Sequence, residues 1–182
     1  EISKEIKRHP PNVLILANHG LVVGEESVEK AEELHNEIIK RLKQKTRLLE
    51  IPNINKLNLI ANKIPNSRLP KYQVVHSLAT DPTSFKRVHN NSPFPDHLVF
   101  CGRRPLIINK DYDIKQNTYG IFEGMGVLLF DGSTIATEEM LKAQAEVFLR
   151  IPANKSINFL SDKQCDEILN MESEKYRRNL FV

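Results

Sequence analysis

The sequence predicts a mixed α/β fold: an α/β/α arrangement around a mixed, largely antiparallel sheet, incomplete at the N-terminal end, plus a second small α/β unit. Three observations predict it. Short apolar runs of strand length alternate with amphipathic segments of helix length. A proline-rich stretch separates two such regions. The 182 residues are 40% hydrophobic and 27% charged, which suits a packed core with a polar surface.

The first unit is expected to span residues 1–50. Residues 1–8 resemble the end of a helix, which two prolines then close. The continuous apolar run at 13–17 predicts a strand buried on both faces. A polar break interrupts this strand, and residues 21–23 resume it.

An amphipathic helix is expected next. Ser27 is a capping residue, and Glu29 lies in the first turn, where a carboxylate complements the helix dipole. We expect the helix to run to about Leu49 and to stop before Pro52, since the residue before a proline disfavours helix. Its apolar face at helical spacing comprises Val28, Ala31, Leu34, Ile38 and Leu42.

Residues 51–95 are divided by prolines into short helical pieces. One piece starts with Asp81 as the cap and Pro82 in the first helical position. We expect this segment to be a helical connector with little core of its own.

The second unit is expected to span residues 96–182. Apolar runs predict strands at 97–101, 106–108, 121–122 and 127–130, the last followed by an Asp-Gly turn.

Two helices should complete this unit. Thr137 is expected to cap the first. Ser161 with Gln164 three residues later predicts a capping box for the second, and Leu160 and Cys165 are spaced to form the accompanying hydrophobic staple.

The two units share a sequence pattern. Residues 15–23 align without gaps to residues 121–129: an apolar pair, a polar interruption, a glycine and an apolar triplet. In this alignment His19 corresponds to Met125. Chance and duplication both remain open as explanations. If it is a duplication, the second copy has lost the imidazole.

Composition narrows the classes of function. The formal net charge is +3, but Lys and Arg alternate with Asp and Glu along the expected helices, which favours a solvated face over a nucleic-acid-binding surface. No run approaches the roughly 18 apolar residues of a membrane helix. Cys101 and Cys165 form no disulfide framework or zinc motif, which suits the cytoplasm. The chain starts at Glu1 within helix-like sequence, so we expect an upstream portion to be missing.

His19 is the residue that suggests chemistry. It lies in the polar break between two strand segments and beside a glycine. An imidazole held on a rigid strand edge is a suitable ligand for a divalent metal. The alternative is a hydrogen-bonded core or turn histidine.

A family resemblance favours the metal. The segment Leu-Ala-Asn-His-Gly-Leu-Val-Val-Gly at 16–24, with the helix after it, resembles the strand–NHG–strand–helix signature of the class II aldolase/adducin family. Residues 95–100, 126–129, 150–152 and 174–177 are similar to the extension found in a longer bacterial branch of that family.

The resemblance implies a metal-dependent reaction. In that family three histidines bind zinc or another divalent ion, and His19 matches the third. The metal stabilises the enediolate of a reversible aldol cleavage of a sugar phosphate or similar hydroxy-carbonyl compound. The resemblance also implies a carbohydrate-like substrate and homo-oligomers.

This sequence departs from the family pattern. No two of its six histidines are separated by a single residue, so the paired ligands and the acid/base carboxylate would precede Glu1. Catalytic zinc sites use about three protein ligands. We therefore expect no catalytic residue in this chain, which would be inactive alone. The alternative is a non-catalytic, adducin-like interaction module.

The other histidines have simpler interpretations. His9, His76 and His89 are expected to face water, and His35 to be a packed or snorkelling side chain on its helix. His97 is expected to have a structural role, with Asp96 as a cap at the start of its strand.

Two arginines suggest a third hypothesis. Arg103 and Arg104 before a proline are candidates for bidentate contact with a phosphate, although an exposed loop pair is commoner. Residues 96–182 are then candidates for binding a regulatory small molecule, through the loops around Arg104 and Gly124. No nucleotide-binding glycine motif is present.

Overall fold

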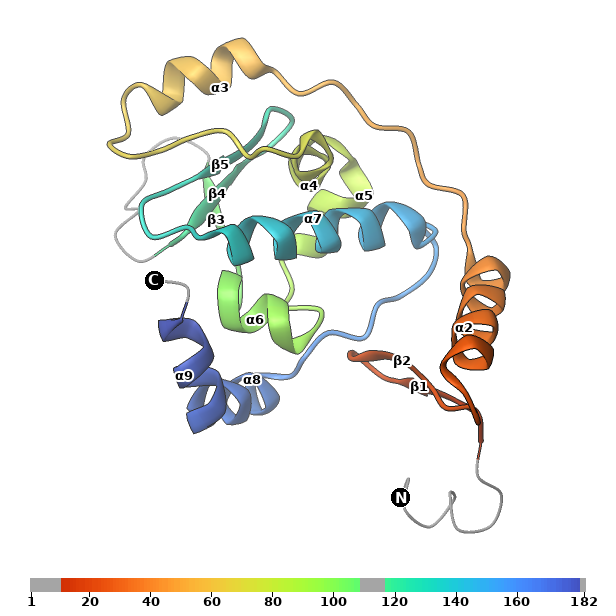
Figure 1. The fold of residues 1–182 in the computed structure, drawn as a ribbon. Helices are drawn as coiled ribbons and strands as arrows, with labels where there is room; N and C mark the ends of the chain where they lie inside the picture. Colours follow the sequence, from red (N-terminus) through yellow and green to blue (C-terminus); the bar gives the residue numbers. More distant parts are fainter. Residues whose placement is uncertain (1–10, 109–116, 181–182) are drawn as a thin grey trace. The chain divides into compact units, whose positions relative to one another are not determined.

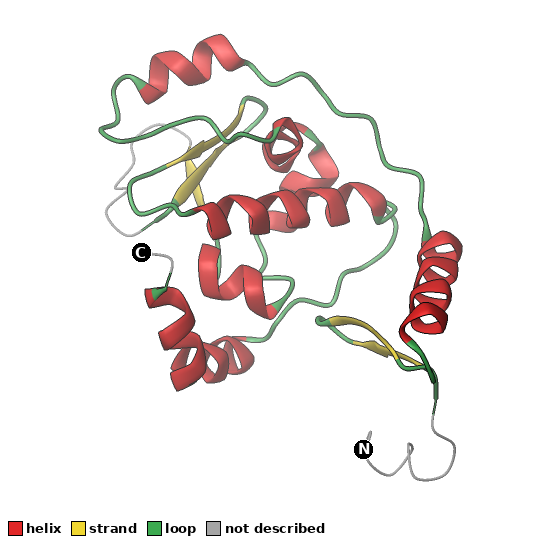
Figure 2. Ribbon diagram, in the orientation of Figure 1, coloured by secondary structure: helices red, strands yellow, loops and turns green. Residues whose placement is uncertain are grey.

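The computed structural model describes residues 11–108 and 117–180, which form two compact units, one up to residue 45 and one from residue 46 (Figure 1). The expected helix tail at 1–8 and His9 lie outside the described residues. The predicted mixed α/β class is confirmed, since helices are combined with a two-stranded and a three-stranded sheet (Figure 2). Among the helices in these ranges, none is long and apolar enough to cross a bilayer.

The first unit is a β-hairpin followed by a helix. Strands β1 (Val13–Leu16) and β2 (Gly20–Val23) pair antiparallel. Helix α2 (Val28–Leu42) starts at the predicted cap, where the Ser27 side chain accepts a hydrogen bond from a backbone N–H. A three-residue turn joins the strands.

Two expectations for this unit are wrong. The strand at 13–17 is not buried on both faces, because Ile15 is 70% exposed and no described residue of the unit is buried. The helix ends at Leu42 rather than near Leu49. Farther along, the backbone N–H of Arg47 donates to the Leu149 carbonyl at 3.1 Å, and a continued helix would direct that N–H to the carbonyl four residues earlier.

The second unit is built on a mixed sheet of order β3-β4-β5. Strand β3 (Leu106–Ile108) lies parallel to β4 (Tyr119–Phe122), and β5 (Gly126–Leu129) lies antiparallel to β4. Around it lie α3 (Ile54–Ala61), η1 (Gln73–His76), α4 (Ser77–Thr80), α5 (Pro82–Val88), α6 (Pro95–Cys101), α7 (Ile135–Arg150), α8 (Asp162–Asn170) and α9 (Glu172–Asn179).

Both faces of this sheet are covered. Alternation along β5 sends Val127 and Leu129 into one apolar cluster, with residues of α4 and α7, and sends Leu128 into another, with Leu57 of α3 (Figure 1). Residues 51–95 therefore supply core side chains to both clusters. The expectation that they carry little core is wrong.

The segment expected as a strand at 97–101 is helix α6. Pro95 occupies its first turn, and Gly102 follows its end with a φ of 82°, a conformation that favours glycine. Most of its side chains are buried, so it has the continuous apolar sequence of a buried strand. That expectation was wrong because a short apolar run does not distinguish the two structures.

The predicted helix caps are largely confirmed. Asp81 caps α5, and Ser161 forms a capping box with Gln164 at α8. Leu160 and Cys165 pack in one apolar cluster, as predicted. Helix α7 starts earlier than expected: Thr134 is the cap, and Thr137 is its partner in a capping box.

Candidate functional site

His19 lies in the turn between β1 and β2. Its backbone N–H donates to the Leu16 carbonyl at 3.1 Å, and Asn18 before it has a φ of 57°. The side chain is exposed, and its imidazole makes no hydrogen bond or ion pair with a described residue. Both ring nitrogens are therefore without a partner among the described residues.

Within the described ranges, no three His, Cys, Asp or Glu side chains are grouped closely enough to hold a metal ion. Among these residues His19 therefore belongs to no such group.

The hairpin at His19 has a counterpart in the second unit. The turn between β4 and β5 has the same length and a matching backbone, with φ of 66° at Gly124 where Asn18 has 57°. The next strand starts in each case with a glycine of positive φ, 141° at Gly20 and 148° at Gly126. The sequence match therefore corresponds to one shared hairpin geometry, with Met125 in the place of His19.

Two histidines are buried in the second unit. His76 was expected to face water, and this is wrong, because it is only 2% exposed. Its Nδ1 accepts a hydrogen bond from the Val127 N–H at 3.1 Å, so this nitrogen carries no proton. Burial lowers the pKa of His76 to about 4. His89 is exposed, as predicted, and His35 is also exposed.

His97 joins α6 to α7, in keeping with its expected structural role. Its Nε2 lies 3.0 Å from the Gln144 Oε1, and its Nδ1 lies 2.6 Å from the Ser92 Oγ. Burial lowers the pKa of His97 to about 4, although the Gln144 bond opposes this. Asp96 is not a strand cap: it lies in the first turn of α6 and pairs with Arg177 at 2.9 Å.

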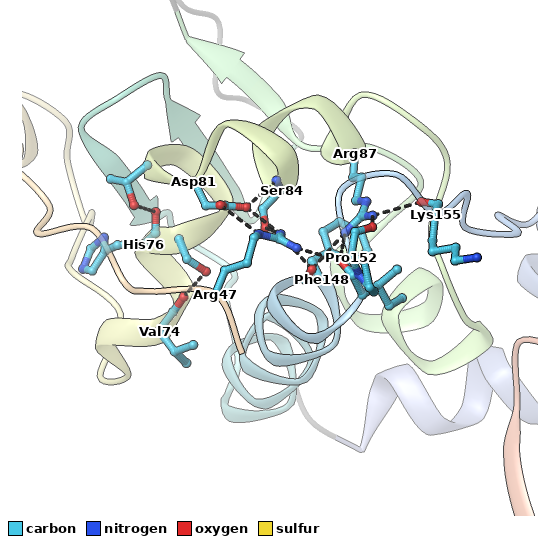
Figure 3. Close-up of polar contacts among 12 residues, drawn as sticks. Arg47, Val74, His76, Asp81, Ser84, Arg87, Phe148, Pro152 and Lys155 are labelled. Carbon is cyan, nitrogen blue, oxygen red and sulfur yellow. Dashed lines mark hydrogen bonds and ion pairs between the residues drawn. The ribbon is translucent and has the colours of Figure 1, made fainter. Parts of the chain in front are cut away.

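A buried polar network holds the C-terminal end of α7 (Figure 3). The Arg47 guanidinium binds both carboxylate oxygens of Asp81, at 3.1 and 2.7 Å, and donates to the carbonyls of Phe148 and Ile151 at 2.9 and 2.6 Å. Burial would raise the pKa of Asp81, but hydrogen bonds from Arg47 and Ser84 hold it below its usual value.

Arg87 completes this network (Figure 3). It donates to four carbonyls, those of Phe148, Ile151, Pro152 and Lys155, at 2.7–3.0 Å. The last carbonyls of a helix have no partner within it, and the two guanidinium groups satisfy them here. The network therefore has a structural role: it is a clamp that holds the end of α7. The sequence does not indicate either arginine, because their partners lie far along the chain.

The predicted phosphate candidates, Arg103 and Arg104, both line a cavity of about 830 Å³ in the second unit. The cavity is bounded by the C-terminal half of α6, the loop after it, the residues before β4, the loop into α7, and parts of α8 and α9. Arg178, Asn91 and Asp162 also face it. Sequence reasoning missed these three, which come from distant parts of the chain.

Cys101 in this cavity is not a nucleophile. Burial raises the pKa of its thiol far above the usual value, so it stays protonated. The thiol also donates to the Thr137 carbonyl at 3.5 Å.

No family model, curated protein or solved structure matches this chain.

Proposed function

We propose that this chain is part of a class II aldolase-like, metal-dependent lyase in which His19 supplies one bond to zinc or another divalent ion. The supporting observation is the position of His19, exposed in a hairpin turn with an imidazole that no described residue engages. A metal ligand needs such an accessible lone pair on a rigid element.

The proposed reaction is the reversible aldol cleavage of a small hydroxy-carbonyl or sugar-phosphate substrate. A divalent ion would act as a Lewis acid on the negative charge that develops on the substrate oxygens, worth several kcal/mol. In this proposal the remaining ligands and the acid/base group are supplied by other polypeptide, and this chain alone is inactive. We place the protein in the cytoplasm, as a homo-oligomer.

The second candidate is a non-catalytic, adducin-like interaction module. It is favoured by the exposed apolar side chains of the first unit, with Ile15 70% and Val28 79% exposed. Exposed apolar side chains mark a surface that binds another protein where they form one contiguous patch, which this candidate requires of the first unit.

Metal content distinguishes the two candidates. We would measure bound zinc, manganese and iron in the full-length protein and in its His19→Ala and His35→Ala variants by mass spectrometry. His35 is the matched control, because it is an exposed histidine of the same unit. The lyase proposal expects bound metal that His19→Ala loses and His35→Ala keeps.

Two results would count against the lyase. Equal metal content in all three proteins would remove His19 from the metal site. A full-length protein that binds no metal at all would favour the interaction module.

A further inference from the structure

The described residues that line the cavity of the second unit carry an excess of positive charge. Three arginines, Arg103, Arg104 and Arg178, line it against one carboxylate, Asp162. Arg103 is neutralised, because it pairs with Asp166 and lies 3.9 Å from Asp162. Among the described residues Arg104 and Arg178 have no carboxylate partner, so within this part of the chain their positive charge is not paired.

Arg104 is held in position by Asn91. The Arg104 Nε donates to the Asn91 Oδ1 at 3.0 Å, and the Asn91 Nδ2 donates to the Leu160 carbonyl and to Asp162, both at 3.0 Å. Because the Leu160 carbonyl can only accept, the Asn91 oxygen must face the arginine. This bond holds the guanidinium in place, and its two terminal nitrogens make no hydrogen bond with another described residue.

Arg178 is the second free donor. Its one contact with a described residue is a long bond of 3.5 Å to the Leu169 carbonyl. Most of its N–H groups therefore have no acceptor among the described residues.

Thr118 adds an unsatisfied hydroxyl at the same cavity. Its Oγ1 is buried and has no hydrogen-bond partner among the residues that the structure describes. A buried polar group without a partner costs about 1–3 kcal/mol. A ligand oxygen could remove this penalty after a change of the Thr118 side-chain rotamer.

Two described lining residues that could carry chemistry are otherwise engaged. The Cys101 thiol stays protonated, and Asp162 accepts a bond from Asn91 beside Arg103. Its volume of about 830 Å³ lies within the range of pockets that hold small molecules and exceeds what an inorganic ion needs. These features fit a binding site for an anion with a polar body.

We infer that this cavity binds a small phosphate monoester, whose phosphate oxygens are contacted by Arg104 and Arg178. Guanidinium groups match phosphate oxygens in pairs, which favours this anion over a monovalent one. All the residues that carry the inference lie in the unit from residue 46, so it stands or falls separately from the proposal for His19.

The test is calorimetric titration of the full-length protein with glycerol 1-phosphate, inorganic phosphate and glycerol at low ionic strength. We expect saturable binding of glycerol 1-phosphate, weaker binding of phosphate and none of glycerol. Arg104→Gln and Arg178→Gln should each weaken binding about tenfold or more, the effect of losing one charge-assisted contact. Arg104→Lys should also weaken binding, because an ammonium keeps the positive charge but cannot donate two parallel hydrogen bonds to one phosphate.

The matched control is Arg150→Gln, an exposed arginine of the same unit that pairs with Glu146 within one helix. It changes the net charge equally and should leave binding unchanged. Nuclear magnetic resonance titration of the wild type gives a second measurement, in which the amides of Gly132 and Thr134 should shift. No saturable binding, equal weakening by Arg150→Gln, or shifts confined to other residues would each overturn the inference.

Discussion

At the scale of single residues, the buried histidines make stability depend on pH. The pKa of His76 and of His97 is about 4 in the folded protein, against roughly 6.5 for an unfolded histidine. Below about pH 6.5 these two histidines are therefore protonated in the unfolded chain but stay neutral in the folded protein. The buried neutral histidines therefore do not lower the stability above about pH 6.5. As the pH falls from about 6.5 towards 4, their protonation in the unfolded chain lowers the free energy of unfolding.

We expect the free energy of unfolding to decrease between pH 7.5 and pH 4.5, by up to about 3 kcal/mol for each histidine. Urea unfolding followed by circular dichroism at several pH values measures this slope. His97→Gln should reduce the slope, because glutamine does not titrate, whereas His89→Gln at an exposed position should not. An identical slope in all three proteins would show that the buried imidazoles do not cause it.

The candidate site could be predicted from sequence only in part. Arg103 and Arg104 attract attention because two adjacent arginines before a proline form a recognisable local pattern. Asn91 and Arg178 carry no such signal, since their relation to Arg104 depends on packing between distant segments. The exposure of His19 is likewise a tertiary property, which the apolar run before it does not indicate.

At the scale of elements, the hairpin of β4 and β5 depends on one glycine. Gly126 has a φ of 148°, and a Cβ there would lie 2.6 Å from both the His76 Nδ1 and the Leu57 Cδ1. Gly124 in the same hairpin has a φ of 66°, and its Cβ would meet nothing within 4 Å. A substitution of Gly124 therefore introduces backbone strain alone, whereas a substitution of Gly126 adds steric overlap.

We expect Gly124→Ala to cost about 1 kcal/mol, the usual penalty for a left-handed residue with a Cβ. Gly126→Ala should cost about 2–4 kcal/mol, because overpacking adds to the strain. Urea unfolding of both variants measures the difference. Equal costs would mean that His76 and Leu57 move aside freely.

Elements with local signals were predicted well, and elements defined by burial were not. The caps at Ser27, Asp81 and Ser161 follow from hydrogen bonds that span three residues, so the sequence is sufficient to find them. The sequence of helix α6 predicts a strand, because its apolar run lies in the core. Pro95 and Gly102 were the local signals for a helix.

At the scale of the whole molecule, the core belongs to one of the two units. Every buried side chain among the described residues lies at Leu57 or beyond. The unit from residue 46 also contains Arg47, whose guanidinium binds Asp81 and the end of α7. These contacts indicate that the second unit reaches its full stability on its own only if it includes Arg47.

We therefore expect a fragment of residues 46–182 to unfold cooperatively, with a midpoint close to that of the same unit in the full chain. A fragment of residues 51–182 lacks Arg47, which leaves Asp81 buried without its ionic partner. It also removes hydrogen bonds from three carbonyls at the end of α7 and just after it, those of Phe148, Leu149 and Ile151. Removing one partner of a buried pair costs about 3–5 kcal/mol, so the shorter fragment should unfold at lower urea. The matched control is Arg47→Ala in the longer fragment, which should reproduce the loss. Equal stability of the two fragments would mean that the clamp on α7 is held by Arg87 alone.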